Sequence, residues 1–192
     1  MNNLYNAGEK YIRDQIKTCP SAEFLMQNDN IVSFSPADFL WGYSYHSHCI
    51  PPFVPESVLI LGYGKGQIAS LIRKIHGSSV KITGVDLVPQ DYEYTEYKMV
   101  ICDAKEFVYS CAKSLIKTRF DYIVVDLFDG CTVPDFVFDD DFARRLKQIT
   151  KQMVCFNICM RDFDRLKSYA EHGFEFHRFV PIFGNNVNFW GV

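Results

Sequence analysis

The sequence predicts an α/β fold, a doubly wound and mostly parallel seven-stranded sheet that ends in an antiparallel C-terminal hairpin. From residue 57 onward, short apolar runs typical of buried strands alternate with amphipathic helical patterns. Such alternation favours parallel strands, because each helix carries the chain back across the sheet. The last two apolar runs are separated only by Gly184-Asn185-Asn186, a turn that pairs them in opposite directions.

The composition indicates one medium-sized domain. The chain has 192 residues, 48% of them hydrophobic, and 20 Lys plus Arg against 23 Asp plus Glu give a net charge of −3. This apolar content can bury a core and excludes wholesale disorder. The charge gives no electrostatic reason to bind nucleic acid. No run has the roughly 18 to 20 apolar residues of a membrane span, and the start lacks a secretory signal. We therefore expect a cytoplasmic protein.

The cysteines and histidines do not form a recognisable metal motif. Seven cysteines are spread along the chain without a C-x-x-C pair, so we expect reduced thiols. Cys155 and Cys159 fall in an apolar run that predicts a buried strand. His46 and His48 stand two positions apart but have no evident third ligand. We expect no metal site.

Residues 1–55 differ from the rest and are predicted to form an N-terminal arm that covers the domain at 56–192. Residues 5–17 have the apolar spacing of a short amphipathic helix. Residues 19–55 are rich in Pro, Ser, Asn and aromatic side chains, and Pro55 closes the segment. This composition is typical of an irregular cover rather than of a second domain.

Within 56–192, each element follows from its own pattern. A short apolar run bounded by turn residues or acids predicts a strand, whereas apolar residues three or four positions apart predict a helix. The expected strands are 58–61, 80–85, 99–101, 120–125, 153–158, 174–182 and 187–192. The expected helices are 68–75, 104–116, 140–148 and 162–171, the first and last of which are followed by Gly77 and Gly173.

The ends of the first four strands carry glycines or acids. The first strand runs into the glycine turn 62–66, and the next three end at Asp86, Asp103 and Asp126. Ligands of open α/β sheets bind at this edge. Asp86 lies 20 residues beyond Gly66, a spacing at which an acid accepts hydrogen bonds from ribose hydroxyls. The sequence therefore predicts a nucleoside ligand.

The glycine turn is neither of the two best-known phosphate loops. A dinucleotide fingerprint, G-x-G-x-x-G, needs a glycine where Gln67 stands, because the third glycine, Gly66, comes one residue early. A P-loop needs G-x-x-x-x-G-K-[ST], which is absent. The turn alone is not specific, so its weight comes from the strand ends that follow it in order.

Four stretches in this order carry a family resemblance. They are VLILGYGKG (58–66), GVDLVP (84–89), CDAKEF (102–107) and FDYIVVDLFDG (120–130), followed by Val133-Pro134 and FARRL (142–146). Together they resemble the S-adenosylmethionine-dependent methyltransferase fold, the Rossmann-like class I fold, and within it the spermidine synthase-like branch. The resemblance runs from about residue 57 to residue 157.

This resemblance implies S-adenosylmethionine as the cofactor. It implies that the glycine turn approaches the methionine and ribose part, and that Asp86 holds the ribose hydroxyls. Asp103 would accept a hydrogen bond from the adenine amino group, with Ala104 beside it. The implied cofactor-binding residues are Gly62, Gly64, Lys65, Gly66, Asp86, Asp103 and Ala104.

The resemblance also implies the catalytic residues. Asp126 and Asp129 match the family's D-x-x-D at the end of the fourth strand, which faces the transferred group. They would orient or deprotonate an amine or hydroxyl of a small-molecule acceptor. His46 is a weaker candidate for the base.

Lys65 distinguishes two transferase reactions. Aminopropyltransferases of this branch usually carry Asp there, which suits the ammonium of decarboxylated S-adenosylmethionine, whereas Lys65 suits the carboxylate of the intact molecule. The arm is also too short and irregular for their N-terminal hairpin domain, and the stretch 45–48 lacks the Glu of their Y-H-E. The sequence therefore predicts a methyltransferase, with aminopropyl transfer and a noncatalytic nucleotide-binding protein as alternatives.

Each site residue also has a purely structural interpretation. Asp86 can end a strand, and Asp103 before Ala-Lys-Glu is a good helix N-cap. Asp126 and Asp129 can be solvated loop acids, and Lys65 can be an exposed loop lysine. The C-terminal strands can lie at an interface, so the sequence is also compatible with a homodimer.

Overall fold

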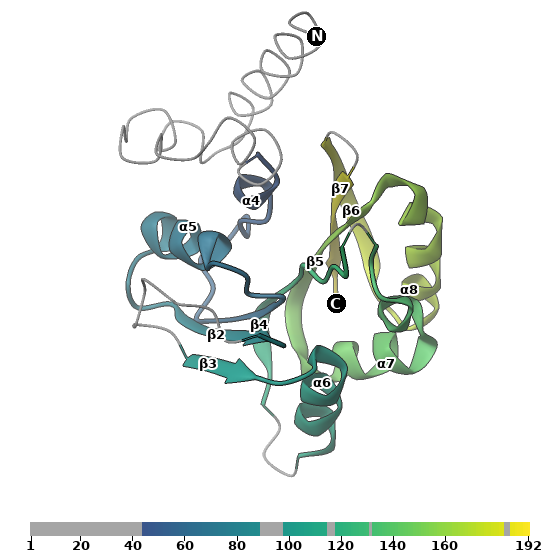
Figure 1. Cartoon of the computed structure of the whole chain (residues 1–192), viewed down its shortest axis with the longest axis horizontal. Coiled ribbons are helices and arrows are strands. Elements are labelled where there is room, and N and C mark those ends of the chain that lie inside the picture. Colours follow the sequence, from purple (N-terminus) through teal and green to yellow (C-terminus); the bar gives the residue numbers. More distant parts are fainter. Residues whose placement is uncertain (1–43, 89–97, 115–117, 131, 183–184) are drawn as a thin grey trace, which may run out of the picture.

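The described strands form one seven-stranded sheet, in the order β3-β2-β1-β4-β5-β7-β6 (Figure 1). The structure is a computed structural model, and it describes residues 44–88, 98–114, 118–130, 132–182 and 185–192. The helix expected at 5–17 lies outside the described residues. The expected arm is described only from residue 44 onward.

The strands are β1 (Ser57–Leu61), β2 (Lys81–Asp86), β3 (Lys98–Ile101), β4 (Phe120–Val125), β5 (Thr150–Cys159), β6 (Glu175–Ile182) and β7 (Asn185–Gly191). The helices are α4 (Ser44–His48), α5 (Gln67–His76), α6 (Ala104–Lys113), α7 (Asp140–Ile149) and α8 (Ser168–Glu171), with 3₁₀ segments η3 (Asp135–Phe138) and η4 (Met160–Lys167). Strands β1 to β5 pair in parallel, and β7 pairs antiparallel with β5 and β6. The fold class predicted from the sequence is therefore confirmed.

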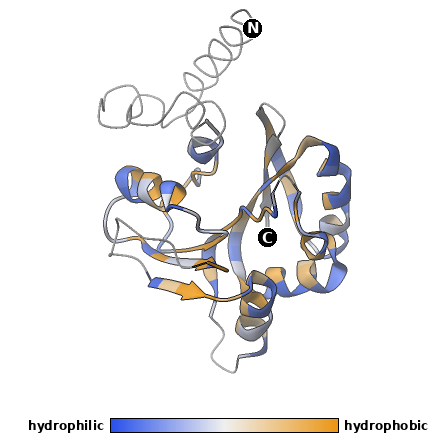
Figure 2. Cartoon of the chain, in the orientation of Figure 1, coloured by the Kyte–Doolittle hydropathy of each residue, from blue (hydrophilic) through white to orange (hydrophobic). Residues whose placement is uncertain are grey.

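The sheet buries an apolar layer on each of its two faces. On β1, Leu59 and Leu61 pack on one side, whereas Val58 and Ile60 pack on the other. Helices α6, α7 and α8 contribute to the first layer, and α5 contributes to the second. Figure 2 shows hydrophilic and hydrophobic residues on different sides of these helices. Strand β4 is buried along its whole length, since it lies in the middle of the sheet.

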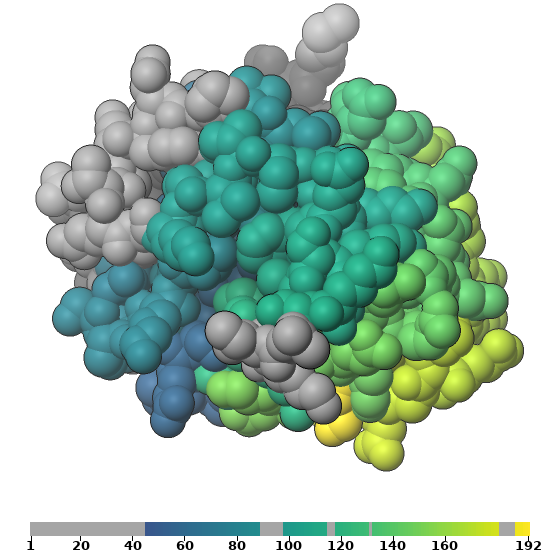
Figure 3. Space-filling view, turned by 90° about the horizontal axis from the view of Figure 1, so that it is seen from below, coloured from purple at the N-terminus to yellow at the C-terminus, as the bar shows by residue number. Residues whose placement is uncertain are grey.

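The direction of chain order reverses between β1 and β4. From β1 the chain moves outward to β2 and β3, then returns to β4 and continues through β5. Seen from below, the teal residues around α6 lie between earlier residues in blue and later residues in green to yellow (Figure 3). Such a reversal opens a crevice at the carboxyl ends of the strands, where ligands bind in α/β sheets.

Three expected elements differ in detail. The last strand begins at Asn185 rather than at 187, because Asn185 and Asn186 pair with β6 instead of forming the expected turn. The helix expected at 162–171 is mostly 3₁₀ helix, because η4 precedes the short α8. Ion pairs at three-residue spacing, such as Asp162–Arg165 and Asp164–Lys167, fit the three-residue turn of a 3₁₀ helix. Strand β5 begins at Thr150 rather than at 153, because Thr150 pairs with Phe120 on β4. None of the described helices has the length and apolar character of a membrane span.

Asp121 anchors the amino ends of the central strands. Its Oδ2 accepts hydrogen bonds from the backbone N–H groups of Glu56 (3.0 Å) and Ser57 (2.8 Å) and from Ser57 Oγ (2.9 Å). Lys151 Nζ lies 3.0 Å from its Oδ1. Burial raises the pKa of Asp121, but hydrogen bonds from Lys151 and Ser57 outweigh burial and hold that pKa below its usual value. One carboxylate therefore joins β1, β4 and β5.

Gly62 lets the loops after β1 and β4 touch. Its φ is +83°, in the left-handed region that favours glycine. A Cβ atom at Gly62 would overlap the backbone carbonyl of Asp126, far inside van der Waals contact. Gly77, at the end of α5, has a similar φ of +93° but has open space around the same position. The missing side chain of Gly62 is therefore required by packing as well as by backbone conformation.

We expect Asp121→Ala to lower the free energy of unfolding by on the order of 3 kcal/mol at pH 7, because two partly buried backbone N–H groups lose a charged acceptor. Lys151→Ala, which removes an exposed partner, is expected to cost only about 0.5 kcal/mol. Urea unfolding measures both. The folded-state pKa of Asp121 is lowered, so its stabilisation is complete above about pH 4 and is lost at lower pH. A deficit that does not shrink on acidification would contradict this role.

We expect Gly62→Ala to destabilise the protein more than Gly77→Ala. Both variants force alanine to a positive φ that L side chains rarely adopt, at roughly 1 to 3 kcal/mol. Only Gly62→Ala must also push the β4 loop away, which costs roughly a further 1 to 3 kcal/mol. Urea unfolding of the two variants measures the difference. Equal losses would show that the loops do not depend on this contact.

Candidate functional site

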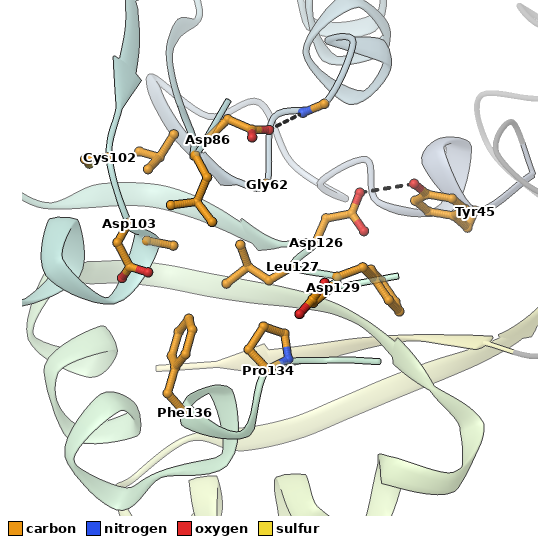
Figure 4. A pocket seen from close by; sticks show the side chains of 15 residues that line it. Tyr45, Gly62, Asp86, Cys102, Asp103, Asp126, Leu127, Asp129, Pro134 and Phe136 are labelled. Carbon is orange, nitrogen blue, oxygen red and sulfur yellow. Dashed lines mark hydrogen bonds between the residues drawn. The ribbon is translucent and has the colours of Figure 1, made fainter. Parts of the chain in front are cut away.

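A cavity of about 560 Å³ opens at the carboxyl ends of the sheet strands (Figure 4). Its walls come from the loops after β1, β2, β3 and β4, from Tyr45 on α4, and from Pro134 and Phe136 around the start of η3. Small-molecule sites usually enclose about 300 to 1,000 Å³. The cavity therefore lies where the strand order reverses and has the size of a nucleoside-type ligand site.

The cavity brings together most of the residues proposed from the sequence. Those that line it are Gly62, Gly64, Asp86, Asp103, Ala104, Asp126 and Asp129. Lys65 and Gly66 are not among the lining residues, and the side chain of Lys65 is exposed. The contact between Lys65 and a ligand carboxylate therefore stays a prediction.

Asp86, at the end of the neighbouring strand β2, holds the turn after β1 through a hydrogen bond. Its Oδ2 accepts a hydrogen bond from the backbone N–H of Gly64 at 2.8 Å, as the dashed line in Figure 4 shows. Its Oδ1 accepts a hydrogen bond from the backbone N–H of Val88 at 3.2 Å. Each carboxylate oxygen can accept a second hydrogen bond, so Asp86 can hold the turn and a ligand hydroxyl together.

Asp103 is the N-cap of α6. Its Oδ1 accepts hydrogen bonds from the backbone N–H groups of Lys105 (2.8 Å) and Glu106 (3.1 Å). This is the structural role that the sequence also allowed. Asp103 lies on the cavity wall beside Ala104, and its capping oxygen is the one turned to the helix. The Oδ2 atom of Asp103 is therefore available to accept a hydrogen bond from a ligand.

Asp126 is a half-buried acid at the end of β4, held from two sides. Tyr45 on α4 donates its hydroxyl to Oδ2 at 3.2 Å, and Asn157 on β5 donates Nδ2 to Oδ1 at 2.8 Å. Burial raises the pKa of Asp126 to about 6, and the nearby charge of Asp86 adds to this effect, while the hydrogen bonds from Asn157 and Tyr45 oppose it. A carboxyl with this pKa can take up or release a proton near neutral pH.

Asp129 differs from Asp126 because it is exposed. It lies in a tight loop in which its backbone N–H donates to the carbonyl of Thr132 (2.8 Å), and the N–H of Thr132 donates back (3.1 Å). This exchange fixes the backbone of Asp129 and leaves its carboxylate at the cavity. The two acids of D-x-x-D therefore offer one desolvated and one solvated carboxylate.

The two histidines of α4 are buried and do not line the cavity. Burial lowers the pKa of His46 to about 3, and burial followed by the charge of Arg178 lowers that of His48 to about 4. Both rings are therefore neutral at physiological pH, and a role of His46 as the base stays a prediction. Among the described residues, no group of three or more His, Cys, Asp or Glu side chains could hold a metal ion.

Sequence reasoning assigned no role to Tyr45 or Asn157. Tyr45 lies 81 positions from Asp126 along the chain, so only the fold brings them together. Asn157 did carry a signal, because it is a polar residue inside the buried apolar run of β5. A buried polar side chain needs a hydrogen-bond partner, and the site supplies it.

The cavity is acidic. Four carboxylates line it, and no Lys, Arg or His of the described residues does. Such a lining attracts cations and repels anions. S-adenosylmethionine carries a sulfonium and an ammonium group, so these carboxylate acceptors suit its cationic groups and its ribose hydroxyls. The described lining offers no cation for its carboxylate.

Comparisons with known proteins identify the fold. No protein-family model matches the chain, and no curated protein matches it in sequence. Among solved structures, a candidate S-adenosylmethionine-dependent methyltransferase from Streptococcus mutans matches 77% of this chain and 48% of its own, with a TM-score of 0.57 and 12% identity. Fibrillarin from Aeropyrum pernix, solved with natively bound S-adenosyl-L-methionine, matches 70% of this chain and 66% of its own (TM-score 0.55, 17% identity).

Spermidine synthase from Thermotoga maritima is similarly related, over 77% of this chain and 59% of its own (TM-score 0.54, 18% identity). The chain thus spans about half to two thirds of the lengths of these three proteins. At such identities the similarity concerns the fold and leaves the reaction open. This chain has the class I methyltransferase fold, as the order of its strand-end motifs indicated.

Proposed function

We propose that this chain is an S-adenosylmethionine-dependent methyltransferase that acts on a small-molecule amine. The observation that carries the proposal is one cavity lined both by Asp86, a suitable ribose-binding acid, and by Asp126, an acid whose pKa lies near 6. The acidic lining favours an amine over a hydroxyl acceptor, because an amine arrives as a cation.

We assign the cofactor to the side of the cavity formed by the turn after β1 and by Asp86, Asp103 and Ala104. Gly62 and Gly64 bring backbone to this side without a side chain in the way. Asp86 keeps accepting capacity for ribose hydroxyls, and Oδ2 of Asp103 keeps it for an amino group. We further propose that the N-terminal arm covers the site, which the position of Tyr45 on the cavity wall supports.

When bound, S-adenosylmethionine supplies a sulfonium methyl that an amine lone pair can attack, forming an N–C bond while the electron pair of the C–S bond stays on sulfur. The acceptor must first give up a proton, because an ammonium has no free lone pair. We assign this proton to Asp126, which binds protons more tightly than an ordinary Asp. Tyr45 fixes the carboxylate that receives it.

Aminopropyl transfer from decarboxylated S-adenosylmethionine is the second candidate. It is favoured by the four carboxylates of the cavity and by the exposed position of Lys65 outside its described lining. A donor without a carboxylate would meet no repulsion there. Similarity to spermidine synthase is consistent with this reaction but is equally strong for methyltransferases.

We expect Asp86→Ala to weaken the binding of S-adenosylhomocysteine by about 10- to 100-fold, because the ribose hydroxyls lose a charged acceptor worth roughly 1.5 to 3 kcal/mol. Isothermal titration calorimetry measures the dissociation constant. Asp121→Asn, at the opposite end of the sheet, serves as a control for a lost carboxylate and should bind normally. An unchanged constant in folded Asp86→Ala protein would remove the ribose assignment.

Calorimetry with two donors separates the two reactions. If Lys65 pairs with the methionine carboxylate, intact S-adenosylmethionine should bind about 10- to 100-fold more tightly than the decarboxylated form, and Lys65→Ala should narrow that gap. Lys74→Ala, an exposed lysine replacement on α5, controls for net charge. Tighter binding of the decarboxylated donor by the wild-type protein would support aminopropyl transfer. Binding of neither donor nor S-adenosylhomocysteine would leave a noncatalytic protein of this fold.

A further inference from the structure

Asn157 is fixed beside Asp126 by the sheet itself. Strands β4 and β5 are parallel with Val125 beside Phe156, so the next residue along each strand brings Asp126 beside Asn157. The backbone of Asn157 also pairs with Val187 on β7, and its side chain is only 1% exposed. Its 2.8 Å hydrogen bond to Asp126 is therefore made by a side chain with little freedom to move.

Packing alone does not explain an amide at this position. The neighbours Phe156 and Ile158 are fully buried apolar residues, and leucine has nearly the shape of asparagine. The Oδ1 atom of Asn157 is buried without a hydrogen-bond partner, and an unpaired buried carbonyl costs stability. Core packing therefore does not account for an amide at position 157, and another role of this side chain must do so.

The chemistry of Asp126 accounts for the amide. Asp126 has two protonation states, and an amide can form a hydrogen bond with either of them. Ionised Asp126 accepts the N–H of Asn157, as the structure has it. Protonated Asp126 has an O–H to donate, and the Oδ1 atom of Asn157 can accept it after a half-turn of the amide. A leucine side chain can form a hydrogen bond with neither state, and a lysine or arginine, which only donates, can form one only with the ionised carboxylate.

We propose that Asn157 is a positioning residue that holds Asp126 in place both before and after it accepts a proton. In the step concerned, an acceptor N–H bond breaks, its electron pair stays on nitrogen, and the proton forms an O–H bond on Asp126. The Oδ1 atom of Asn157 then accepts that O–H until the proton passes to water. The source of the proton rests on the proposed function, whereas the two-state contact is a property of the free protein.

Other titratable groups also act on Asp126. Tyr45 donates to its second oxygen from α4, the Cys49 thiol follows the same helix, and the carboxylate of Asp86 approaches from β2. Tyr45 and Cys49 both have a pKa raised by burial, so they stay protonated at neutral pH. The charge of Asp86 raises the pKa of Asp126.

Carboxyl ¹³C NMR of the ligand-free protein tests the proposal, with Asp126→Asn used to assign the Asp126 signal. Asn157→Leu keeps the volume and removes both amide functions. The hydrogen bond to the ionised carboxylate is charge-assisted and is therefore the stronger of the two that are lost, so we expect Asp126 in this variant to bind its proton about tenfold more tightly and its pKa to rise. Asn188→Leu, which removes another buried amide, on β7 beside Phe156, should leave that pKa unchanged. Asn157→Ala provides the same test if the leucine variant does not fold.

The side-chain signals of Asn157 test the second half of the proposal. In the wild-type protein, its carbonyl carbon should shift with the same midpoint as Asp126, and its amide should stay ordered on both sides of that midpoint. An unchanged Asp126 pKa in folded Asn157→Leu and Asn157→Ala proteins, or an Asn157 signal that ignores pH, would overturn it. S-adenosylhomocysteine should bind the Asn157 variants normally. If it binds none of the proteins, the proposed function fails while the NMR result stands.

Discussion

The partial burial of one carboxylate, that of Asp126, is the constraint on which the site depends. Taking a charge out of water is costly unless hydrogen bonds replace the water. Those bonds come from Tyr45 on α4 and Asn157 on β5, and the room for the Asp126 backbone comes from Gly62 after β1. Three parts of the chain that are distant in sequence must therefore come together before Asp126 has its partly buried, hydrogen-bonded carboxyl with a raised pKa.

The fold was predictable because its signals are local. Strands buried on both faces contain unbroken apolar runs, such as residues 58–61 of β1 and 122–125 of β4. The acids and glycines at the strand ends were informative for the same reason, since parallel strands bring their carboxyl ends to one edge whatever the helices between them do. Details set by side-chain pairing, such as the 3₁₀ form of η4, were not predictable from periodicity.

The site was predictable only in part, and the difference is physical. Asp86 and Asp126 line the cavity because strand ends determine their position. Whether a loop side chain points into a cavity depends on the turn that carries it, so the sequence could not place Lys65. It also gave no basis for pairing Tyr45 with Asp126, because that contact spans 81 positions. Asn157 shows that a polar residue in a buried strand is a usable signal, although it does not name its partner.

The acidity of the cavity and the raised pKa of Asp126 are parts of one electrostatic arrangement. The charge of Asp86 makes ionisation of Asp126 harder, whereas a cation bound between them makes it easier. Binding of a cationic ligand and loss of the Asp126 proton are therefore linked, and each favours the other by the same free energy. A carboxyl with a pKa near 6 is well suited to this linkage, because it is only partly ionised in the free protein at slightly acidic pH. The cavity thus couples occupancy by a cation to the ionisation of Asp126.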